Sequence, residues 1–269
     1  MGGTGAADSA DPVDLNAICP YRQPQAWRTV PGVRFPRLPH LLLAAALALP
    51  PLAAQAADPL PADPMARRML ACVACHGQDG RATNQGYFPR IAGKPAGYLF
   101  NQLLHFRDGR RINATMTHLV EHMSDAYLRD IAGYFAGLDL PYPAPQTTGA
   151  PPAVLARGEQ LVRVGDAALG VPACAACHGA AMTGIQPAMP GLLGLPRDYL
   201  LGQFGAWRNG LRKASAPDCM GEIARRLSPD DVSAMAVWLS SQPVTGGPAP
   251  ASAAPDPWPM RCGSAEVLK

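Results

Sequence analysis

Two copies of one pentapeptide, Cys72-Val-Ala-Cys75-His76 and Cys174-Ala-Ala-Cys177-His178, decide how this chain folds. The C-x-x-C-H spacing is that of covalent c-type haem attachment. The two cysteines of each copy can form thioethers to the haem vinyl groups, and the histidine that follows can place its imidazole on the iron. The sequence therefore predicts two covalently bound haem c groups, one on each pentapeptide.

The surroundings of the two motifs repeat at an offset of about one hundred residues, which is typical of tandem copies of one fold. The stretch Pro89-Arg-Ile-Ala-Gly93-Lys-Pro95 corresponds to Pro190-Gly-Leu-Leu-Gly194-Leu-Pro196. A further set follows in the same order in both halves: Tyr98, Gln102, Phe106, Arg107, Gly109 and Arg111 correspond to Tyr199, Gln203, Trp207, Arg208, Gly210 and Arg212.

Each copy is predicted to be helical. A short helix leads into each haem motif, over 64–71 with Asp63 as its N-cap and over 152–164 in the second copy. Amphipathic helices are expected over 96–108 and 197–209, where aromatic and aliphatic residues recur every three to four positions. The last helices begin after the capping residues Ser124 and Ser228. No stretch alternates in the manner of a half-buried strand, so the fold class is all-α, with one small helical bundle around each haem.

Length and composition set the domain organisation. The chain has 269 residues and a net charge of +3, which allows two domains of about 100 residues and gives no sign of nucleic-acid binding. We expect haem domain 1 at 57–140, a Pro-rich linker at 141–152, haem domain 2 at 153–242, and a Pro/Ala-rich tail at 243–269 that lies on the surface without regular structure.

Residues 1–56 are predicted to be an N-terminal extension with a secretory signal peptide. Arg34 and Arg37 precede an apolar run at 41–49, and small residues end at Ala56, which makes Ala57 the expected mature start. The apolar run is shorter than the ~20 residues that span a bilayer, and an uncleaved anchor is the alternative. We expect export to the periplasm.

The function depends on the sixth ligand of each iron. Met116 and Met220 are the only methionines that coincide between the copies, so we predict that they are the axial thioether ligands opposite His76 and His178. The rivals His118 and His122 have Glu222 and Arg226 as their counterparts and are expected, with His105, on solvated helix faces. Imidazole and thioether together fill both axial positions, so such a centre passes single electrons.

Pro89 and Pro190 follow the haem histidines by 13 and 12 residues. A carbonyl at that position can accept the other ring N–H of the histidine and fix the ring, although a simple turn proline would have the same spacing.

Over about residues 62–242 the chain resembles the diheme class I cytochromes c, most closely the cytochrome c4 type. The resemblance rests on both C-x-x-C-H-G motifs, the segment Phe88–Pro95, Phe106–Arg110, and Met116 followed by Met123-Ser-Asp. It implies two helical domains with His/Met ligation and favours the Pro89 and Pro190 carbonyl bonds. It also implies a periplasmic respiratory-chain carrier between a quinol-oxidising complex and a haem–copper terminal oxidase, rather than an enzyme.

Cys219 and Cys262 are not part of either haem motif. In an exported protein two spare cysteines favour a disulfide, which would hold the tail beside the second haem. The alternatives are free thiols, or Cys219 as a thiolate ligand of the second iron, because it immediately precedes Met220.

Two other functions stay open. One is a cytochrome subunit of a membrane dehydrogenase or oxidase complex. The other is an enzyme, a diheme peroxidase or thiosulfate dehydrogenase, which would need an open or thiolate position on one iron. Methionine in both copies argues against the enzyme.

Overall fold

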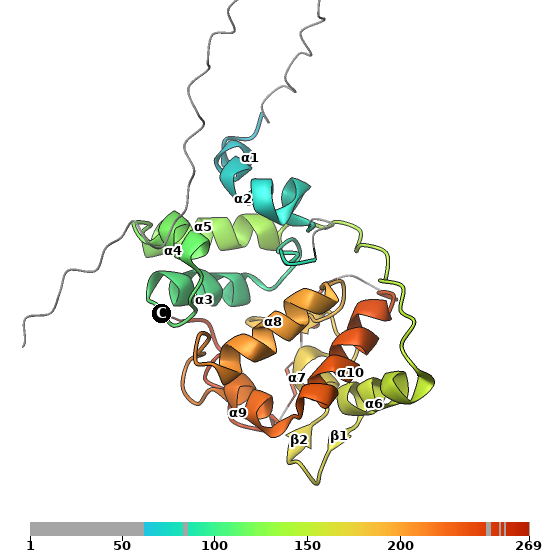
Figure 1. Ribbon diagram of the computed structural model, residues 1–269. Helices are drawn as coiled ribbons and strands as arrows, with labels where there is room; N and C mark the ends of the chain where they lie inside the picture. Colours follow the sequence, from blue (N-terminus) through green and yellow to red (C-terminus); the bar gives the residue numbers. More distant parts are fainter. Residues whose placement is uncertain (1–61, 83–85, 246–248, 253, 256, 269) are drawn as a thin grey trace, which may run out of the picture. The chain divides into compact units, whose positions relative to one another are not determined.

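The computed structural model describes residues 62–82, 86–245, 249–252, 254–255 and 257–268 (Figure 1). The predicted signal segment and its cleavage site lie outside the described residues. From residue 62 on, the chain belongs to one compact unit. Within the described ranges, none of the helices has the length and apolar character needed to cross a bilayer.

The first half of this unit is built from short helices. They are α1 (Pro64–Arg68), α2 (Leu70–His76), the 3₁₀ turn η3 (Gln78–Gly80), α3 (Ala96–Arg107), α4 (Ala114–Val120) and α5 (Asp125–Ala136). Asp63 caps α1 as predicted, accepting hydrogen bonds from the backbone N–H groups of Met65 and Ala66. The predicted helix 64–71 is interrupted at Met69, so that a separate helix, α2, ends on the haem histidine. Helix α3 packs on both α5 and α4.

The second half repeats this order with two small additions. Its elements are α6 (Pro152–Arg163), α7 (Cys174–His178), α8 (Arg197–Arg208), α9 (Cys219–Arg226) and α10 (Pro229–Ser241), with strands β1 (Gly165–Asp166), β2 (Val171–Pro172), β3 (Gly184–Ile185) and β4 (Met189–Pro190). The strands form two antiparallel pairs, with Gly165 opposite Pro172 and Gly184 opposite Pro190. Each strand has two residues, so the all-α fold class is confirmed.

Helices α4 and α9 were not predicted, although both carry proposed ligands. The side chain of Asn113 accepts a hydrogen bond from the Met116 N–H at 3.0 Å, and that of Asp218 accepts one from the Gly221 N–H at 2.9 Å. These caps start each helix just before its methionine, so Met116 and Met220 both lie in a first helical turn. The helices have seven and eight residues, shorter than the window of about 11 residues over which a helical period is counted.

Each half has its own hydrophobic core. The first cluster includes Leu99, Phe100, Leu104, Leu128, Ile131 and Phe135. The second includes Leu161, Val162, Leu200, Phe204, Met235, Trp238 and Leu239. The residues that recur every three to four positions along α3 and α8 supply part of each cluster, which is why the predicted amphipathic helices formed.

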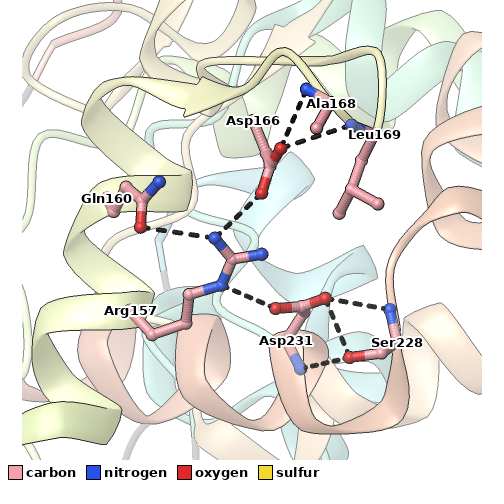
Figure 2. Close-up of polar contacts among 7 residues, drawn as sticks. All are labelled: Arg157, Gln160, Asp166, Ala168, Leu169, Ser228 and Asp231. Carbon is pink, nitrogen blue, oxygen red and sulfur yellow. Dashed lines mark hydrogen bonds and ion pairs between the residues drawn. The ribbon is translucent and has the colours of Figure 1, made fainter.

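In the second half, an ionic network ties α6 to α10 and to the β1–β2 hairpin (Figure 2). The Arg157 guanidinium lies 2.9 Å from the Asp166 carboxylate and 2.7 Å from that of Asp231. Asp231 in turn accepts hydrogen bonds from the N–H and hydroxyl of Ser228, the N-cap of α10. The guanidinium lowers the pKa of Asp166. The network therefore ties the middle of α6 to the N-terminal end of α10, two helices that enclose the second core.

The crossing of α6 and α10 gives a stability prediction. A Cβ added at Gly158 would lie 2.3 Å from the Ala234 carbonyl oxygen and 2.7 Å from the Trp238 Cβ. Gly158→Ala should therefore force the helices apart and destabilise the protein by about 1–3 kcal/mol, measured by denaturant unfolding. Gly133→Ala is the matched control, because nothing lies within 4 Å of that position in α5; it should be neutral or stabilising. Equal effects of the two substitutions would contradict the packing argument.

The C-terminal tail is more ordered than the sequence analysis expected. Its described residues form no helix, but the backbone of Ala251 pairs with Gly184 and Gln186, and Cys262 is bonded to Cys219. Beyond the disulfide, residues 262–268, here called the C-terminal strap, reach α3. The buried Asn101 side chain donates to the Glu266 carbonyl and accepts from the Leu268 N–H, both at 2.8 Å. The strap thus links the second half of the chain to the first.

Candidate haem sites

Each haem motif occupies the end of a short helix. His76 is the last residue of α2 and His178 the last of α7. The glycine that follows each histidine has a positive φ, +77° at Gly77 and +84° at Gly179. A Cβ at Gly77 would lie 2.3 Å from the Ala82 carbonyl oxygen, so the chain can turn this tightly only at glycine.

A proline carbonyl fixes each histidine ring. The Nδ1 atom of His76 lies 2.9 Å from the Pro89 oxygen, and that of His178 lies 2.7 Å from the Pro190 oxygen. Burial lowers the pKa of both histidines, which favours the neutral imidazole. A neutral ring that donates Nδ1–H to a carbonyl presents the lone pair of Nε2, the form in which imidazole binds iron.

One cavity of about 770 Å³ collects all ten residues that the sequence singled out as cofactor-binding. Its walls include both motifs, both prolines, and the methionines Met116 and Met220. The four motif cysteines are free of disulfides. The donor set at each motif is therefore two thiols, one imidazole nitrogen and one thioether, which fits covalently attached haem with N/S ligation.

The rival ligands lie elsewhere. The side chains of His118 and His122 are 84% and 94% exposed, and both approach the carboxylate of Glu121. Cys219 is bonded to Cys262, so it is not a thiolate that could bind iron.

The expectation of a solvated His105 was wrong. This histidine is 2% exposed, and its Nε2 lies 3.4 Å from the Ser215 hydroxyl in the second half. Burial, together with the charges of Arg110, Arg212 and Arg111, lowers its pKa to about 4, so it is neutral at pH 7. The error came from placing it by helix periodicity alone, because the contact that buries it comes from a distant part of the chain.

A polar cluster that joins the two halves was missed as well. The Arg111 guanidinium donates to Gln102, to Gln203 at 2.7 Å and to the Tyr199 hydroxyl at 3.0 Å. Arg212 donates to the same two glutamines, at 2.6 Å to Gln203 and 3.1 Å to Gln102. All of these residues belong to the repeated set, so the signal was present: Gln102 and Gln203 recur within the two amphipathic helices, and Arg111 and Arg212 recur just after those helices end.

This cluster also bears on the fit of haem. Arg111 and Arg212 are both less than 10% exposed and, within the part of the chain that the structure describes, neither forms an ion pair with a carboxylate. Trp207 Nε1 is the one buried side-chain polar atom without a hydrogen-bond partner among the described residues. All three residues line the cavity. Unpaired buried donors and cations fit a group that brings carboxylates, as haem does with its propionates.

A duplicated helical unit with a haem-attachment motif, a fixed histidine and a methionine in each copy defines a diheme class I cytochrome c. Comparison with known proteins supports this class. The chain is 37% identical over 175 residues to a thiosulfate dehydrogenase electron acceptor of Thiomonas intermedia, covering 65% of this chain and 79% of the relative. It is 36% identical over 170 residues to cytochrome c4 of Pseudomonas aeruginosa, covering 62% and 82%. No family model matches.

Comparison with solved structures supports the same class of protein. Reduced cytochrome c4 from Pseudomonas stutzeri superposes with a TM-score of 0.55 at 31% identity, over 65% of this chain and 94% of that one. A thiosulfate dehydrogenase, TsdBA, from Marichromatium purpuratum gives a TM-score of 0.59 at 30% identity, over 65% of this chain and 37% of that longer chain. The chain therefore belongs to the cytochrome c4 family. It is a diheme electron-transfer cytochrome with two covalently bound haem c groups.

Proposed function

We propose that the ten cavity residues hold the two haem groups and that the protein is a single-electron carrier rather than an enzyme. Cys72 and Cys75 attach the first haem and Cys174 and Cys177 the second. His76 with Met116, and His178 with Met220, supply the axial ligands. The observation that carries this proposal is the joint placement of these residues around one cavity, with each imidazole held by a proline carbonyl.

The surrounding residues suit this role. Haem c supplies an iron that gains and loses one electron. The proline carbonyls keep each ring in one orientation, so little has to move when the charge changes. With haem bound, the imidazole and the thioether of each half would both hold its iron and would leave no ligand position for a substrate. The buried Arg111–Arg212 cluster is proposed to bind the propionates and hold both centres in one rigid frame.

We further propose that a thiosulfate dehydrogenase is the electron donor, that a haem–copper terminal oxidase is the acceptor, and that this exchange takes place in the periplasm as part of a respiratory chain. The donor is supported by the relative in Thiomonas intermedia, which is named as the electron acceptor of that enzyme. The quinol-oxidising complex expected from the sequence, and membership of a membrane dehydrogenase or oxidase complex, are the alternatives that an experiment must separate.

Stopped-flow reduction of the purified oxidised protein distinguishes these donors. We expect reduction of both haems when thiosulfate and a catalytic amount of thiosulfate dehydrogenase are added, and no reduction by thiosulfate alone. Reduction by thiosulfate alone would identify an enzyme. Reduction only by quinol with a quinol-oxidising complex would favour the other donor. Isolation of the native protein bound to a larger membrane complex would favour the subunit role.

A further inference from the structure

Lys94 is a buried cation of the first half of the chain whose side chain contacts the second half. It is 2% exposed, and its Nζ donates a hydrogen bond to the Gly191 carbonyl at 2.9 Å. Within the described part of the chain no carboxylate pairs with it. Burying a charged amine without a counter-ion is unfavourable, so we ask which function the buried charge of Lys94 serves.

The acceptor of this hydrogen bond lies next to the second haem histidine. Gly191 follows Pro190, whose carbonyl accepts from His178 Nδ1 at 2.7 Å. The Lys94 amine is therefore separated from the carbonyl that holds the His178 ring by a single residue of backbone, and its charge is felt at that histidine. The charged residue that acts in the same way on His76 is Arg111, a member of the cluster shared by both halves. Lys94 thus acts on the second centre although it belongs to the first half.

The repeat is broken at this point, so no lysine occupies the matching position of the second copy. The counterpart of Lys94 is Leu195, a buried apolar side chain. The counterpart of Gly191 is Arg90, whose guanidinium donates to the carbonyls of Leu140 and Pro141 in its own half and the linker. A Cβ at Gly191 would lie 2.4 Å from the Thr183 carbonyl oxygen, so the second half has no room for a side chain there.

We propose that Lys94 is a positioning residue for the second haem centre, one that raises the reduction potential of that centre relative to the first. A positive charge close to an iron site stabilises the form with the extra electron, and the effect is strong in a buried, weakly screened place. The two centres have the same ligand types, so a lysine without a counterpart in the repeat would help to make them inequivalent and bias an electron toward the second haem. The inference rests on the proposed His/Met ligation.

The charge on Lys94 depends on pH. Burial and the nearby charge of Arg90 lower its pKa to about 7. The other groups that face it are the Tyr142 ring, 5.9 Å from Nζ, and His178. The reduction potentials of the wild type and of Lys94 variants are therefore compared at pH 6, below that pKa, where the amine is charged.

The test is an optical redox titration of the haem-loaded protein. Lys94→Gln keeps a hydrogen-bond donor and removes the charge, so the ferrous-to-ferric ratio of haem 2 at a fixed potential should fall about threefold to tenfold, where tenfold is 59 mV for one electron. Lys94→Met should do the same, and Lys94→Arg should retain the original value. Arg197→Gln is the matched control, since Arg197 is an exposed cation in the second half outside the lining of the haem cavity; it should change neither haem.

Repeating the titration in a Met116→His background assigns the two transitions, because that substitution moves haem 1 alone. A haem 2 potential that is unchanged in Lys94→Gln, or that falls equally in Lys94→Arg, would overturn the role of the charge. If Met116→His moves neither transition, the ligand assignment itself has failed, which is a separate result from a failure of Lys94.

Discussion

Replacement of Met116 or Met220 by alanine should abolish the near-infrared methionine-to-iron absorption of one haem and leave that of the other. The reduction potential of the altered centre should fall by on the order of 100 mV or more, within the roughly 0.8 V range that axial ligands set. The physical reason is that a soft thioether favours ferrous iron, and its loss removes that preference. Absorption spectroscopy of the oxidised protein and redox titration measure the two effects.

The control for this experiment comes from the repeat. Met123 also lines the cavity, but its counterpart in the second half is Leu227. Met123→Leu therefore places in the first half the residue that the second already has, and both near-infrared bands should persist. Loss of a band in Met123→Leu, or two intact bands in Met116→Ala, would show that the ligand was assigned wrongly.

Loss of the Cys219–Cys262 disulfide should be the largest stability change. The bond closes a loop of 43 residues, for which the loop-closure entropy of the unfolded chain corresponds to about 4 kcal/mol. Cys262→Ser should lower the free energy of unfolding by about that amount, measured in guanidinium with the haem absorption as the probe. Cys262 is chosen because Cys219 adjoins Met220. A substitution of Cys219 would disturb both the disulfide and the proposed iron ligand.

A reductant provides the control. Tris(2-carboxyethyl)phosphine should destabilise the wild-type protein as far as Cys262→Ser does, and it should have no further effect on the variant. The C-terminal strap should become sensitive to carboxypeptidase in both cases, because it would then be held by non-covalent contacts alone, such as the hydrogen bonds of Asn101. Equal stability of the variant and the oxidised wild type would refute the entropic argument.

Local signals predicted most of the helices well. Asp63, Ser124 and Ser228 were identified as caps, and each accepts hydrogen bonds from the first turn of its helix. Such caps act within three residues, so a short window of sequence contains the whole interaction. Helices α4 and α9 were not predicted because their caps, Asn113 and Asp218, precede segments of only seven and eight residues, shorter than the window of about 11 residues over which a helical period is counted.

Contacts between residues far apart in the chain could not be predicted from the sequence. His105 was placed wrongly because residues more than a hundred positions away bury it, and the Arg111–Arg212 cluster was recognised only as a repeat. Neither the hydrophobic period of a helix nor a capping residue carries information about which distant surface will cover it. The same holds for Lys94, whose acceptor is 97 residues away.

The sequence by itself determined the haem-attachment motifs, their duplication, the helical class and the candidate ligands, because covalent chemistry and local backbone preferences act over a few residues. Only the tertiary structure decided how the two copies contact each other. The cross-half contacts of Lys94, the strap on Asn101 and the buried arginine pair arise from the way two similar units pack together, and packing depends on shapes and charges that meet only after folding.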